Sequence, residues 1–266
     1  MRSPILVTSH YVRTAAMATT SVVGDSPLFL VDYLLRFARV AVLLSLWRII
    51  LADKGPVSGM TLSAVLTYTL ISEIFAEQLA CRANMEMTLW EGTIAVRSLQ
   101  PMSLVGQLAA EMAGRWLLGL ILVSAPLLLS AGLWGVDARP ATAAAGALFV
   151  LSMALSISVG LALEMLFGAL VVALQESIWL VQQLRNAITT VLSGALLPLA
   201  LLPWGLGGVF AWLPFASQAS APLRIYTNTG DAAQLLAIQA GWSLLLWPMA
   251  HWFWQANREK LTAYGG

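Results

Sequence analysis

Long stretches without a charged side chain constrain this sequence more than any other feature. Residues 116–136, 140–163 and 232–257 contain 21, 24 and 26 residues, respectively, without an Asp, Glu, Lys or Arg. A helix needs roughly 20 apolar residues to cross the hydrocarbon core of a bilayer. Charged residues make up only 10% of the chain, against about 25% in soluble domains. The chain is therefore predicted to be a membrane protein.

Two weaker candidate spans precede these stretches. Residues 57–80 are interrupted by Glu73 and Glu77, and residues 26–51 contain four charged side chains. An ionised side chain at the centre of a membrane helix costs about 2.5–3.5 kcal/mol. Arg36 and Arg39 in the first span should therefore face protein, either as structural pairs in a helix bundle or along a transport path. Since Asp32 lies four residues before Arg36, the two can pair on one helix face.

Residues 186–223 form an uncharged stretch of 38 residues. As one helix it would run about 57 Å, which is too long for a single crossing. Prolines and glycines interrupt its second half: Pro198, Pro203, Gly205, Gly207, Gly208, Pro214 and Pro222. We expect a span followed by a broken hairpin that re-enters the membrane, packed against protein.

The predicted fold is an all-α membrane protein with six transmembrane helices in a single domain, residues 25–266. The expected spans are approximately 26–51, 57–80, 114–136, 141–170, 180–201 and 232–256, with an external hairpin at 202–226. Residues 1–24 carry a weak apolar stripe, Ile5, Val12, Ala16 and Val23. We expect them to form a helix lying in the membrane interface. Residues 82–113 form the longest connection outside the membrane.

The distribution of basic residues predicts the orientation. If both termini share one side, that side carries Arg2, Arg13, Arg82, Arg97, Arg115, Arg185, Arg258 and Lys260. The opposite side carries Lys54, Arg139 and Arg224. Because eight basic residues on one side face three on the other, we expect both termini to lie in the cytoplasm.

Motifs for catalysis and nucleotide binding are missing from the sequence. Neither lysine, Lys54 or Lys260, belongs to a GxxxxGK[ST] phosphate loop, and no HExxH motif is present. We therefore expect no enzyme activity and no metal site in this chain. A net charge of +1 argues against nucleic acid as a partner.

The fourth span carries a regular ridge of small and polar residues. Ser152, Ser156, Gly160, Glu164 and Gly168 recur every four residues and therefore lie on one helix face. Small residues let helices approach closely. Three roles stay open for Glu164: packing against another helix, a part in a substrate or proton path, or a position at the cytoplasmic edge. If packing is its role, glutamine should be tolerated there and leucine should be destabilising.

The order of these features resembles the permease subunits of ABC-2-type exporters over essentially the whole chain. Residues 91–103, EGTIAVRSLQPMS, are similar to a family pattern in which a glycine precedes a leucine–arginine–proline turn, although Gln100 replaces the arginine. Residues 193–203, SGALLPLALLP, resemble the family's stop before the external hairpin. Residues 213–230, LPFASQASAPLRIYTNTG, resemble its exit.

The resemblance implies a function and partners. Such permeases form homo- or heterodimers in the bacterial cytoplasmic (inner) membrane, bind two separate ATPase subunits that hold ATP and Mg²⁺, and bind no cofactor themselves. The connection between spans two and three acts as the coupling helix. Residues 91–101 are therefore the expected ATPase contact, with Trp90, Glu91, Gly92, Ile94, Arg97 and Pro101 as its site residues. Met87, Trp90 and Ile94 fall on one apolar helical stripe.

The expected function is thus export of an amphipathic or hydrophobic substrate, such as a drug, antibiotic, peptide or lipid. Two alternatives stay open: a secondary transporter, and a membrane assembly or immunity protein without transport activity. A secondary transporter would usually show internal repeats with broken helices at matching places. An ATPase that co-purifies with the chain would favour the exporter.

Overall fold

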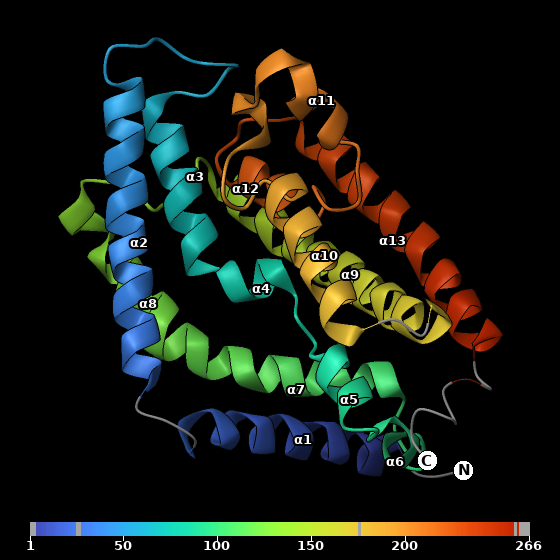
Figure 1. Cartoon of the computed structure of the whole chain (residues 1–266). Coiled ribbons are helices and arrows are strands. Elements are labelled where there is room, and N and C mark those ends of the chain that lie inside the picture. The colour runs from blue at the N-terminus through green and yellow to red at the C-terminus, as the bar shows by residue number, and fades with distance from the viewer. Residues whose placement is uncertain (1–3, 25–27, 175–176, 258–259, 261–266) are drawn as a thin grey trace.

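The computed structural model describes residues 4–24, 28–174, 177–257 and 260, and helices joined by loops make up these ranges (Figure 1). An isolated bridge between Val57 and Met60 is the one extended pairing within them. The α-helices are α1 Pro4–Gly24, α2 Leu28–Leu51, α3 Leu62–Ile74, α4 Ala76–Ala80, α5 Met85–Trp90, α6 Ile94–Ser98, α7 Leu104–Gly119, α8 Ala125–Leu129, α9 Ala143–Leu174, α10 Ile178–Leu192, α11 Leu206–Phe210, α12 Ser220–Tyr226 and α13 Ala232–Ala256. The all-α prediction is confirmed.

Two helical stretches in the described part of the chain are long and apolar enough to cross a membrane, Leu104–Trp134 and Ala143–Leu174. The first consists of α7, a π segment at Leu120–Ser124, α8 and a 3-10 turn. It begins at Leu104, before the expected start near 114, because the side chain of Ser103 caps the Gly106 N–H. Part of the expected connection is therefore helix α7.

Helix α1 lies along α7 at one end of the molecule (Figure 1). The Thr19 hydroxyl donates a hydrogen bond to the Gly114 carbonyl, 2.9 Å away. A Cβ on Gly114 would lie 2.1 Å from the Ala15 carbonyl oxygen, so this crossing requires glycine. Val12 faces away from α7 and is 64% exposed. The side chains of Ile5 and Val23, also expected in the apolar stripe, lie outside the described residues.

The second expected span is broken rather than continuous. Helix α3 begins after the cap Thr61, and α4 follows a kink at Phe75. At the kink, the Ser124 hydroxyl donates to the Ile74 carbonyl at 2.6 Å. A side chain inserted into the backbone ladder in this way is a common cause of helix kinks. Helix α4 ends at Cys81, which adopts a left-handed conformation with φ 45°.

Helix α10 ends at Leu192, before the expected end near 201, because Gly194 follows with φ +78°. The segment up to α12 then turns back into the protein, where Ser220 N–H donates to the Ser193 carbonyl at 2.8 Å. The Tyr68 hydroxyl donates to the Gly194 carbonyl and the Ser72 hydroxyl to the Ala195 carbonyl, both at 2.7 Å. These bonds satisfy irregular backbone that packs inside the helix bundle.

The elements gather at two ends of the molecule (Figure 1). Helix α11 and the α2–α3 loop lie at one end, and α1, α5, α6 and α7 lie at the other. Helices α9 and α13 run side by side between the ends. The Lys260 ammonium donates to the Ala173 carbonyl at 2.9 Å, so the end of the described chain lies beside the end of α9.

Candidate functional site

The members of the ridge on α9 contact α10, α13, the returning segment and the link from α4 to α5. Ser152 and Ser156 hold the returning segment: the Ser156 hydroxyl donates to the Gln218 carbonyl, and the Ser152 hydroxyl donates to Gln239 Oε1 at 2.8 Å. Gln239 in turn donates to the Ser217 carbonyl at 2.8 Å. The N-terminal half of the ridge therefore fixes the returning segment against α9 and α13.

The two glycines of the ridge lie against the link from α4 to α5. A Cβ on Gly160 would lie 2.5 Å from the Cys81 Cβ, and one on Gly168 would lie 2.7 Å from the Met85 Cγ. Both positions therefore provide room for a neighbouring chain segment, which is the packing role expected for small residues.

Glu164 lies between these glycines in a buried ion pair. Its Oε2 lies 2.5 Å from Arg185 Nη2 on α10, and its Oε1 accepts the Met85 N–H at 3.2 Å. The two side chains are only 2% and 4% exposed. One carboxylate thus joins α9, α10 and α5. Arg185 was expected only as one of the basic residues of the cytoplasmic side.

Arg36 and Arg39 on α2 pair with the broken second helix. Arg36 Nη2 lies 3.1 Å from Glu77 Oε1, and Arg39 Nε lies 3.2 Å from Glu73 Oε1. Arg36 therefore faces protein, as the cost of a charge in lipid requires, whereas the Arg39 side chain is 56% exposed. The side chain of Asp32, which could also pair with Arg36, lies outside the described residues.

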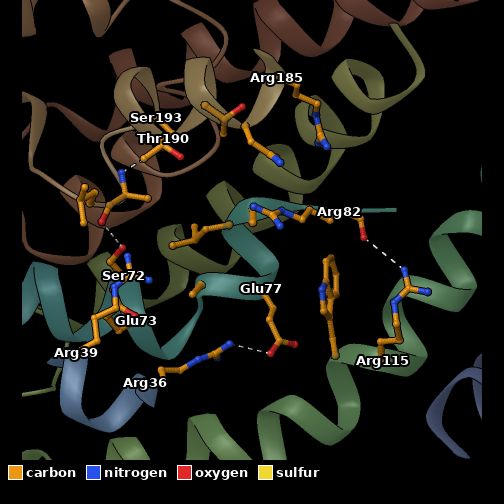
Figure 2. A pocket seen from close by; sticks show the side chains of 18 of the residues that line it. Arg36, Arg39, Ser72, Glu73, Glu77, Arg82, Arg115, Arg185, Thr190 and Ser193 are labelled. Carbon is orange, nitrogen blue, oxygen red and sulfur yellow. Dashed lines mark hydrogen bonds and ion pairs between the residues drawn. The ribbon is translucent and has the colours of Figure 1, made fainter. Parts of the chain in front are cut away.

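Both of these pairs line a cavity of about 570 Å³ between α2, α3, α4, α7 and α10 (Figure 2). Five arginines and two glutamates contribute to its wall: Arg36, Arg39, Arg82, Arg115, Arg185, Glu73 and Glu77. Figure 2 shows Arg36 and Arg39 on one side of the cavity and Arg82 and Arg115 on another. The basic count in the sequence contained Arg82 and Arg115, but nothing in their spacing indicated that they line one cavity with Arg36 and Arg39.

The segment from α5 to α7 presents apolar side chains at the end of the molecule where α1 also lies. Trp90, Val96 and Leu99 are 62%, 62% and 86% exposed. Glu91 and Pro101 are exposed as well. Gly92 adopts φ +64° between the two short helices, which is a conformation that favours glycine.

This turn changes how two of the expected site residues are presented. A continuous helix would place Ile94 beside Trp90, but the break at Gly92 turns Ile94 inward, where it is 4% exposed. Arg97 is not presented to a partner either, since its guanidinium binds both oxygens of Glu111 at 2.6 and 3.3 Å. Ile94 and Arg97 hold the segment in place, whereas Trp90 and Leu99 are accessible.

A metal site is not evident in the described ranges, where no group of three or more His, Cys, Asp or Glu side chains could hold an ion.

A family model described as ABC-2 family transporter protein matches residues 37–265. The chain belongs to the ABC-2 transporter family. No curated protein and no solved structure matches it.

Membership confirms the resemblance of the sequence to ABC-2 permeases and makes this chain the membrane component of a transporter. ABC-2 permeases carry no ATPase domain and generally work with ATPase partners. The family match includes the exposed segment from α5 to α7, the α9 ridge and every lining residue of the arginine-lined cavity except Arg36.

Proposed function

We propose that this chain is the transmembrane subunit of an ATP-driven exporter and that a separate ATPase docks on residues 90–101. The observation that carries the proposal is the exposed apolar group Trp90, Val96 and Leu99. Exposed aromatic and aliphatic side chains of this kind serve as anchors in protein interfaces. Glu91, Gly92 and Pro101 belong to the same contact.

The internal contacts of this segment suit it for transmitting force. The Arg97–Glu111 pair ties α6 to α7, and Gln107 Nε2 donates to the Arg97 carbonyl at 2.9 Å. Because the segment is tied to α7 at two points, a push by the ATPase on Trp90 and Leu99 would move α7 as well. Helix α7 continues into the apolar stretch that ends at Trp134.

The membrane arrangement that we propose has six crossings, with both termini in the bacterial cytoplasm and α1 in the membrane interface. The exposed apolar face of α2 supports lipid contact: Leu35, Val42 and Ile49 recur every seven residues and are 63%, 65% and 79% exposed. Residues 202–226 form the external re-entrant hairpin in this arrangement, and within it residues 216–223 are buried. Irregular backbone at membrane depth requires such burial.

The substrate that we propose is amphipathic or hydrophobic and leaves the cell through a dimer of permeases. The dimer contains either two copies of this chain or this chain and a second permease. Arg36 and Arg39 take part in the path as walls of the cavity, whereas Gly160, Glu164 and Gly168 act in helix packing.

Affinity purification of the tagged full-length chain from its native host tests this function. We expect a stoichiometric ATPase that contains a phosphate loop, and ATP hydrolysis by the purified complex. Export by the reconstituted complex should then stop when ATP is replaced by a non-hydrolysable analogue. A chain that moves substrate in vesicles without any ATPase would contradict the proposal and indicate a secondary transporter.

A further inference from the structure

The cavity between α4, α7 and α10 contains more positive charge than its neighbours neutralise. Its wall holds five arginines against two glutamates. Glu77 pairs with Arg36, and Glu73 pairs with Arg39. Arg185 pairs with Glu164, which does not itself line the cavity. Arg82 and Arg115 are left without a carboxylate within ion-pair distance among the described residues.

Arginine cannot lose this charge by deprotonation, because its guanidinium stays protonated in proteins. Its planar donors match a phosphate or carboxylate group in a two-bonded geometry. The one hydrogen bond between the two residues joins Arg115 Nη2 to the Arg82 carbonyl at 3.4 Å, which brings α7 to the end of α4. Figure 2 shows this bond between the Arg115 side chain and the Arg82 backbone.

The rest of the wall suits an amphipathic molecule. Ala76, Leu79, Ala80 and Leu196 are apolar, and Thr189, Thr190 and Asn186 offer neutral hydrogen-bonding groups. A volume of about 570 Å³ lies within the range of small-molecule sites. Arg82 and Asn84 are exposed, so the cavity can be reached from the surface of the molecule.

We infer that this cavity binds the anionic head group, a phosphate or carboxylate, of an amphipathic molecule, with Arg82 and Arg115 as its main ligands. The inference rests on the proposed function, because it takes the bound amphiphile to be the class of exported substrate. It narrows that class from amphipathic or hydrophobic molecules to amphipathic anions.

Binding of dioctanoyl phosphatidic acid to the purified full-length chain in detergent tests the site. Dioctanoylglycerol, which has the same tails without the phosphate, and inorganic phosphate are the matched probes. The variants are Arg82→Gln, Arg115→Gln and their combination. Arg139→Gln is the control, since Arg139 is exposed and does not line the cavity.

We expect the wild type and Arg139→Gln to bind dioctanoyl phosphatidic acid equally, and the double variant to bind it roughly tenfold or more weakly, as for the loss of charged hydrogen bonds. Dioctanoylglycerol should bind to the wild type no more tightly than phosphatidic acid binds to the double variant. Equal affinity of the double variant and the wild type for phosphatidic acid would overturn the inference. So would complete displacement of the lipid by equimolar phosphate, which would assign the site to a free anion.

Folding of the variants is measured independently. Neither Arg82 nor Arg115 has an ion pair in the described chain, so the melting temperature of the lipid-free double variant should stay near that of the wild type. The binding measurement needs no ATPase. A wild-type chain that assembles with its ATPase but does not bind phosphatidic acid would refute only this inference, whereas lipid binding by a wild-type chain that recruits no ATPase would refute only the exporter function.

Discussion

Arg185 Nη2 on α10 lies 2.5 Å from Glu164 Oε2 on α9, in an ion pair that is almost completely buried. Removing one partner from such a pair leaves the other charge uncompensated and typically costs 3–5 kcal/mol. The ridge pattern alone indicated that glutamine would be tolerated at position 164, but the sequence did not reveal the arginine opposite. The pair changes that expectation.

We therefore expect Glu164→Gln to lower the thermal stability of the purified chain, because Arg185 stays charged. The compensated double variant, Glu164→Leu with Arg185→Met, should be more stable than either Glu164→Leu or Glu164→Gln alone, since apolar residues of similar volume can replace a buried pair. Melting of the detergent-solubilised variants measures the effect. A Glu164→Gln variant as stable as the wild type would show that the pair contributes little.

The close approach of α9 to Cys81 gives a second prediction. Gly160→Ala should destabilise the chain by about 1–3 kcal/mol, the usual cost of overpacking, because its Cβ would lie 2.5 Å from the Cys81 Cβ. Cys81→Gly should restore part of this loss by removing that Cβ, and glycine also suits the φ of 45° at position 81.

Gly241 on α13 is the matched control. A Cβ there would meet nothing within 4 Å, so Gly241→Ala should be neutral or stabilising by up to about 1 kcal/mol through helix propensity. The melting temperatures of the three variants test the comparison. Equal destabilisation by both glycine substitutions would argue against a specific contact at Gly160.

Much of the helical arrangement could be predicted from local sequence. Long uncharged stretches and the four-residue repeat in α9 are local patterns, and they indicated the helices and the ridge. The ridge members were identified correctly because i and i+4 positions share a face whatever the tertiary fold. The partners that they contact could not be predicted, since Glu164 and Arg185 belong to different helices.

Residues 90–101 also show what local sequence cannot predict. The stripe from Met87 to Ile94 assumed one continuous helix, but the left-handed Gly92 rotates Ile94 into the core. A glycine in the sequence signals a possible break without giving its direction. The arginine-lined cavity was missed because Arg36, Arg115 and Arg185 come from three helices and Arg82 from the link between α4 and α5, and charge patterning along one helix does not show such convergence.

Thiol labelling in intact cells tests the proposed orientation. In a Cys81→Ser background, an impermeant reagent should label Ala141→Cys and should not label Gln100→Cys until the cells are opened. Both positions are exposed on the protein, so accessibility to the reagent depends on the side of the membrane. Labelling of position 100 but not of position 141 would reverse the topology and remove the segment from the ATPase.

The most direct test of the account is the amount of ATPase retained by variants of the exposed segment. Trp90→Ala and Leu99→Ala remove accessible apolar side chains, whereas Trp204→Ala removes a tryptophan that is 91% exposed at the opposite end. A buried aromatic anchor contributes about 2 kcal/mol or more to an interface, or roughly a 30-fold change in affinity. We predict that Trp90→Ala with Leu99→Ala loses most of the co-purifying ATPase while Trp204→Ala retains it; a full complement of ATPase on both would contradict the assignment of residues 90–101 as the docking site.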